Sequence, residues 1–84
     1  MSDTGYSSGQ LGLYRGTVTD DVDPLQRSRV EVDVPGVGVS GTWAEVSAPL
    51  DGDPVSPPAV GSGVWVMFEG GEIDHPVVVG GLTP

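Results

Sequence analysis

Carboxylates are the densest group of side chains that could do chemistry in this 84-residue chain. Asp20, Asp21 and Asp23 fall within four positions, and Asp51 and Asp53 flank a glycine. Calcium prefers such oxygen ligands, but the spacing does not match the twelve-residue helix–loop–helix pattern and lacks its closing Glu. Proline or glycine accompanies both clusters. We therefore interpret them as turns and expect no metal ion.

Catalytic chemistry has little support in the sequence. The single histidine, His75, stands beside Pro76, and no nucleophile or orienting acid is recognisable around it. Acid–base and nucleophilic catalysis require such a grouping. Cysteine is absent, which excludes disulfides and thiolate metal sites. We expect neither an enzyme nor a bound cofactor.

The charge balance excludes several partners. The net charge is −9, and Arg15, Arg27 and Arg29 are the only basic side chains apart from the histidine. Nucleic acids and anionic membranes are bound by clustered Lys and Arg, so we expect neither partner. Trp43 and Trp65 offer rings for base stacking, but the basic groove that accompanies such rings is missing. We expect Arg27 and Arg29 to pair with carboxylates, within the chain or across an interface.

The elements that position these residues are strands. The longest apolar run, residues 62–69, predicts a central strand with Val64, Val66 and Phe68 on one face. Trp65 and Met67 then lie on the opposite face. A strand that is apolar on both faces needs cover on both. We therefore predict that Trp65 and Met67 contact another subunit.

Alternation and turn residues predict four more strands, with a flexible loop over residues 36–41. The strands are residues 11–20, 28–35, 42–48 and 75–81. Gly12 and Gly16 in the first strand indicate a bend or a close backbone approach. Residues 69–74 predict a hairpin-type turn in which glycine takes the positive-φ positions. Five short strands without helical periodicity favour an all-β, five-stranded, partly open barrel with no long helix.

Residues 1–10 are mostly small and polar, and they predict a flexible N-terminal arm in front of a barrel domain at residues 11–84. Tyr6 is the one large side chain of the arm apart from the terminal Met, and two interpretations stay open: an anchor on a neighbouring subunit, or one residue of an unordered tail. A chain this short buries only roughly 60% of its unfolded surface. Partner chains are then the expected source of added stability.

The order of several short motifs resembles a known family. The motifs are Tyr14-Arg15-Gly16-Thr17-Val18, Asp23-Pro24-Leu25-Gln26-Arg27-Ser28-Arg29-Val30-Glu31-Val32, Trp43-Ala44, Pro58-Ala59-Val60-Gly61, Val64-Trp65-Val66-Met67-Phe68-Glu69-Gly70-Gly71 and His75-Pro76-Val77-Val78-Val79-Gly80. Over about residues 12–81 their order is similar to the OB-fold domain of phage baseplate spike and hub proteins. These relatives include gpV-like baseplate proteins and the VgrG-like spikes of type VI secretion.

The resemblance implies a structural role in a contractile phage tail baseplate or related injection machine. It implies baseplate hub and spike proteins as partners, a homo-oligomer with a trimer favoured, and a place in the virion tail of a protein made in the host cytoplasm. The chain ends at Pro84 without a needle or lysozyme segment, so a stand-alone adaptor is expected, with the needle on another chain. The alternative is an OB-fold module that binds an oligonucleotide or an oligosaccharide.

Overall fold

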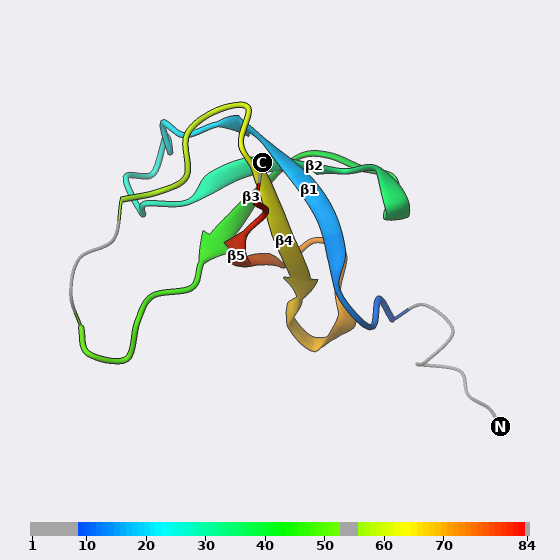
Figure 1. Ribbon diagram of the computed structural model, residues 1–84. Coiled ribbons are helices and arrows are strands. Elements are labelled where there is room, and N and C mark those ends of the chain that lie inside the picture. The colour runs from blue at the N-terminus through cyan, green and yellow to red at the C-terminus, as the bar shows by residue number, and fades with distance from the viewer. Residues whose placement is uncertain (1–8, 53–55, 84) are drawn as a thin grey trace, which may run out of the picture.

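Five strands form one closed barrel in the computed structural model of the protein, which describes residues 9–52 and 56–83 (Figure 1). The strands are β1 (Tyr14–Asp20), β2 (Val30–Val34), β3 (Val39–Val46), β4 (Gly63–Phe68) and β5 (Pro76–Gly81). Within the described residues the only helical pieces are the 3-10 turns η1 (Pro35–Val37) and η2 (Glu69–Gly71). The prediction of an all-β, five-stranded barrel without a long helix is confirmed.

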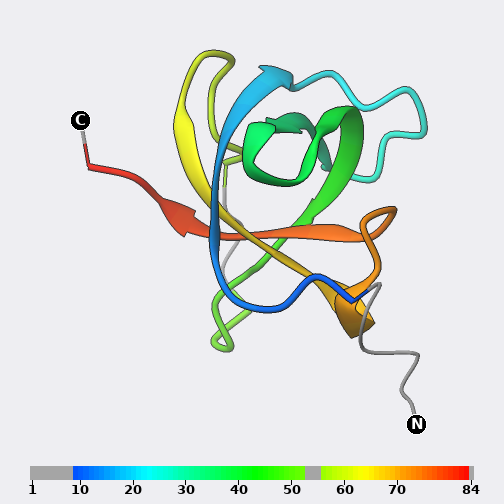
Figure 2. The same ribbon diagram turned by 90° about the vertical axis from the view of Figure 1, so that its right-hand side faces the viewer.

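The strands follow one another around the barrel in the order β1-β2-β3-β5-β4. β1 pairs antiparallel with both β2 and β4, and it curves around the barrel to do so (Figure 2). The circle closes where β3 meets β5 in parallel, through the residue pairs Glu45–Val77 and Val46–Val78 and a 2.9 Å hydrogen bond from the Ser47 N–H to the Val78 carbonyl oxygen. The expectation of a partly open barrel is therefore wrong: the barrel is closed, although by a short seam between β3 and β5.

Alternate residues of each strand fill the interior, as the period of a strand requires. The buried hydrophobic residues are Val18, Val30, Val32, Val34, Val39, Ala44, Val64, Val66, Phe68 and Val78. Tyr14 packs edge-on against the Phe68 ring, with 5.6 Å between ring centroids. Each fully buried valine contributes roughly 1.5–3 kcal/mol of favourable burial.

Both glycines of the first predicted strand have the roles expected of them. Gly12 has a φ of 87°, which turns the chain before β1 begins. Gly16 is buried, and a Cβ atom added there would lie 3.0 Å from both the Asp33 carbonyl oxygen and a Val66 methyl group. The first strand consequently starts at Tyr14, three residues later than predicted.

The predicted loop over residues 36–41 is wrong in its second half, because β3 already begins at Val39. Gly38 takes a left-handed conformation (φ 72°) and reverses the chain directly after η1. Val39 then pairs with Val34 and is buried in the core, a tertiary contact that overrides the flexible composition. The turn after β4 does place Gly70 and Gly71 at positive φ, as predicted.

The predicted N-terminal arm falls mostly outside the described residues, and so does Tyr6. Its last residue is described: the Gln10 backbone N–H donates to the Gly71 carbonyl oxygen at 2.8 Å. The chain thus enters β1 from beside the β4–β5 turn (residues 69–75).

Replacing Val66 with alanine should lower the free energy of unfolding by about 2 kcal/mol, because the lost methyl groups leave a cavity in a fully packed interior. Val60→Ala is the matched control, since Val60 is 56% exposed and should change stability by less than about 0.5 kcal/mol. Chemical denaturation measures both, and equal effects would contradict this account of the core.

Candidate functional site

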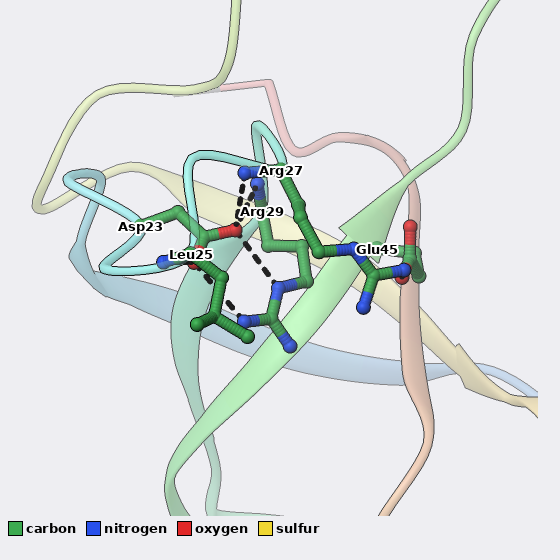
Figure 3. A network of polar contacts seen from close by, with 5 residues as sticks. All are labelled: Asp23, Leu25, Arg27, Arg29 and Glu45. Atoms are coloured by element: carbon green, nitrogen blue, oxygen red, sulfur yellow. Dashed lines mark hydrogen bonds and ion pairs between the residues drawn. The ribbon is translucent and has the colours of Figure 1, made fainter.

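The side chain of Asp23 organises the β1–β2 loop (residues 21–29), as Figure 3 shows. Only 2% of this side chain is exposed. Oδ1 accepts from the Leu25 N–H at 2.9 Å and from Arg29 Nη2 at 3.0 Å. Oδ2 accepts from Arg29 Nε at 2.9 Å and from the backbone N–H groups of Arg27 and Arg29 at 3.1 and 3.2 Å. Five donors therefore converge on one carboxylate, two of them from a single guanidinium.

The backbone of the loop is shaped to bind an anion. Gln26 and Ser28 have φ values of 55° and 60°, in the left-handed region that non-glycine residues rarely adopt. When left-handed residues alternate with right-handed ones, successive backbone N–H groups point toward one place and form a concave site for an anion. Asp23 supplies the anion from the chain itself. Its hydrogen bonds offset the strain at the two positions.

Electrostatics strengthen the same contact. The hydrogen-bonded Arg29 guanidinium holds the pKa of the Asp23 carboxyl well below its usual value of 3.8, against the opposing effect of burial. The backbone N–H groups that face the carboxylate lower this pKa further. In return, the hydrogen bond to Asp23 raises the pKa of Arg29. The pair is charged throughout the physiological range.

The other two arginines are also engaged within the chain. Arg27 reaches over the loop to Glu45 on β3, with 3.1 Å between Nη2 and Oε2, in a pair that is more than half exposed (Figure 3). Arg15 lies over the Trp65 ring at 5.1 Å from its centroid, and Arg29 lies 5.8 Å from that of Trp43. The prediction that Arg27 and Arg29 pair with carboxylates is confirmed, and both partners belong to the same chain.

Trp65 and Met67 lie on the outer surface of β4, opposite the core-facing residues, as their alternation predicted. Trp65 is half-buried beneath Arg15, whereas Met67 is 45% exposed. Met67 pairs with Val77 of β5, and the pairing of Tyr14 with Val66 brings the exposed Leu13 alongside Met67 on its other side. We name Leu13, Trp65, Met67 and Val77 the outer apolar strip.

Sequence reasoning missed Leu13 as part of this surface. In a strand over residues 11–20, alternation puts Leu13 on the same face as Arg15, and this pattern is the signal from which Leu13 could be found. Its neighbourhood with Met67 depends on the antiparallel register of β1 and β4, which only the structure provides. The expectation that Trp65 and Met67 contact another subunit stays a prediction.

Two further kinds of site were sought in the structure. Among residues 9–52 and 56–83, no group of three or more His, Cys, Asp or Glu side chains could hold a metal ion. In the same part of the chain no helix is long and apolar enough to cross a membrane. His75 lies exposed in the β4–β5 turn, where its backbone N–H donates to the Glu72 carbonyl oxygen.

Comparison with known protein families gives a match over most of the chain. A family model described as the type VI secretion system/phage-baseplate injector OB domain matches residues 14–82. The matched segment begins at the first residue of β1 and ends one residue after β5, so it contains the whole barrel. A comparison with curated proteins gives no match.

Replacing Asp23 with asparagine should lower the stability of the fold at pH 7. It should also remove part of the loss of stability that the wild type shows at low pH. A carboxyl with a depressed pKa in the folded state stabilises the fold above its unfolded pKa, and this contribution is lost as the pH falls below that value. The difference in melting temperature between wild type and Asp23→Asn should therefore be large at pH 7 and shrink below pH 3.8. Asp21→Asn removes the same charge from an exposed position in the same loop and serves as the control. A wild-type-to-variant difference that stays constant down to pH 2 would contradict this assignment.

The two loop arginines should differ sharply in their contribution to stability. Arg27→Ala should change the free energy of unfolding by only about 0–1 kcal/mol, because its ion pair with Glu45 is exposed to solvent. Arg29→Lys keeps the charge but loses the two-pronged contact with Asp23, so it should cost clearly more than Arg27→Ala. Urea denaturation of the two variants decides the order, and a reversed order would refute it.

Proposed function

The chain belongs to the family of type VI secretion system/phage-baseplate injector OB domains, and from this membership we propose that it is a structural component of a contractile phage tail baseplate or related injection machine. More specifically, it acts as an OB-fold adaptor between hub and spike proteins. It assembles as a homo-oligomer, with a trimer favoured, in the baseplate of a particle whose subunits are made in the host cytoplasm.

The outer apolar strip is the observation that carries the adaptor role. The interior of the barrel is already filled, and Leu13, directly before β1, and Met67 on the neighbouring β4 remain 51% and 45% exposed. Adjacent exposed apolar side chains on a small protein are typical of a protein–protein interface. Trp65, Met67 and the arm residue Tyr6 are the proposed contacts with subunits. Arg27 and Arg29 flank a second surface at the β1–β2 loop.

The proposed role is mechanical and involves no catalysis. A closed barrel whose strands are all hydrogen-bonded to neighbours holds its outer side chains in fixed positions. A subunit that joins hub and spike must hold its contact residues in fixed positions, so that the orientation of one protein determines that of the other. Docking through the outer apolar strip also supplies the apolar burial that a domain of this size lacks on its own.

The alternative is a module that binds an oligonucleotide or oligosaccharide, and one observation favours it. Trp43 lines a surface groove on the face of the barrel that carries ligands in other OB folds. Binding of a nucleic acid is disfavoured, because all three arginines already contact carboxylates or aromatic rings of the same chain. A mobility-shift assay with single-stranded DNA at low salt separates the two functions, since micromolar binding would favour the module.

Met67→Glu should weaken association with a baseplate hub protein at least tenfold, about 1.4 kcal/mol, because it places a carboxylate in the middle of an apolar contact. The exposed position of Met67 means that the fold itself should tolerate the change. Val60→Glu, at an exposed valine outside the strip, adds the same charge and should leave association unchanged. Light scattering of each protein, alone and with a candidate hub protein, provides the measurement.

Two outcomes of that experiment would reject the adaptor role. One is a wild-type chain that stays strictly monomeric and ignores hub and spike proteins. The other is a Met67→Glu variant that assembles as well as the wild type.

A further inference from the structure

A groove of about 370 Å³ lies between the β1–β2 loop, β3 and the β4–β5 turn. Its lining residues are Arg27, Arg29, Trp43, Glu45, Glu69, Asp74, His75 and Pro76. In OB folds the face of the second and third strands, with the loops after the first and fourth strands, binds oligonucleotides and oligosaccharides. The groove occupies that face, and its volume lies within the ~300–1,000 Å³ range of small-ligand sites.

The charges in the groove do not suit a phosphate backbone. Arg29 is bound to the buried Asp23, and Arg27 is paired with Glu45. Glu69 and Asp74 remain, and in the part of the chain that the structure describes neither forms an ion pair. The excess charge of the groove is therefore negative. A nucleic acid strand would be repelled where other proteins with this fold attract it.

The lining of the groove suits a cation. Trp43 contributes an aromatic ring, and its electron-rich surface already attracts the Arg29 guanidinium at 5.8 Å. Glu69 and Asp74 are the carboxylates that would pair with an incoming positive group. The combination of an aromatic ring with carboxylates favours arginine, since a planar guanidinium both stacks on rings and forms paired hydrogen bonds with carboxylates.

We propose that this groove receives an arginine side chain presented by a partner protein. The identity of that partner as a baseplate subunit rests on the proposed function, whereas the groove and its preference for a guanidinium do not. The groove lies where other OB folds bind their ligands, but its excess charge is negative, whereas the grooves that bind nucleic acid are positive. The chain has a net charge of −9, and its three arginines are engaged within the chain. A basic partner protein would therefore find complementary charge in this groove.

The test is an NMR titration of the full chain with acetyl-arginine amide, followed at the indole N–H of Trp43 and the backbone amides of the β4–β5 turn. The indole N–H of Trp65 serves as an internal reference on another face. Saturable shifts at Trp43 and the turn are expected, with a dissociation constant of roughly 1–10 mM for a single side chain. Acetyl-citrulline amide, a neutral isostere of the probe, should produce no saturable shift there.

Matched variants locate the site. Glu69→Gln with Asp74→Asn should weaken arginine binding at least tenfold. Glu72→Gln with Asp21→Asn removes two carboxylates from exposed positions outside the groove and should leave binding unchanged. The proposal is overturned if citrulline binds as well as arginine, or if the groove variant keeps its affinity. It is also overturned if a (dT)10 oligonucleotide or a chitin trisaccharide shifts Trp43 at lower concentration than arginine does.

Light scattering with a hub protein separates this proposal from the function above. If the groove variant binds the hub as tightly as the wild type, the hub does not supply the arginine, and the assignment of the partner fails while the adaptor role stands. If arginine titrates into the groove but the wild type ignores every hub and spike protein, the adaptor role fails while the site stands.

Discussion

The narrow interior of a five-stranded barrel is the constraint on which the rest of this structure depends. Among the described residues, eight of the ten buried hydrophobic side chains are valines, and one strand needs a glycine so that the backbones can approach. Phe68 is the one side chain larger than valine among these ten. The two tryptophans and Met67 are consequently left on or near the surface, although their chemistry favours burial. The exposure of these side chains thus results from the way the core is packed.

A second constraint is the small number of positive charges. The chain has three arginines against twelve acidic residues, and each arginine is used to hold a neighbouring part of the same molecule. Arg29 fixes the β1–β2 loop through Asp23, Arg27 ties that loop to β3, and Arg15 covers Trp65. With the cations used internally, the surface that remains for partners is anionic. This distribution does not favour the nucleic acids that many proteins with this fold bind.

Local pattern predicted the strands well, because alternation of valine with charged residues and glycine punctuation follow directly from strand and turn geometry. The prediction of a loop was wrong at residues 39–41. Their glycine-rich composition favours a loop, but Val39 is buried in the core and begins β3. The arginine–carboxylate pairing could be expected from scarcity of positive charge, but the choice of Asp23 for Arg29 depends on left-handed residues that no pattern indicated. The groove could not be predicted either, since Trp43 and the β4–β5 turn meet only after β3 and β5 pair.

The seam between β3 and β5 has a consequence for motion. Every other junction of the barrel is an antiparallel ladder of at least three residue pairs, whereas this one is parallel and contains two. Thermal opening is expected to cost least at the junction with the fewest paired residues. Since β1 pairs with both β2 and β4, such an opening would leave two intact strand pairs, β2–β3 and β4–β5, joined through β1. Torque applied to the two strand pairs from outside would be absorbed at this line before any other part of the barrel yields.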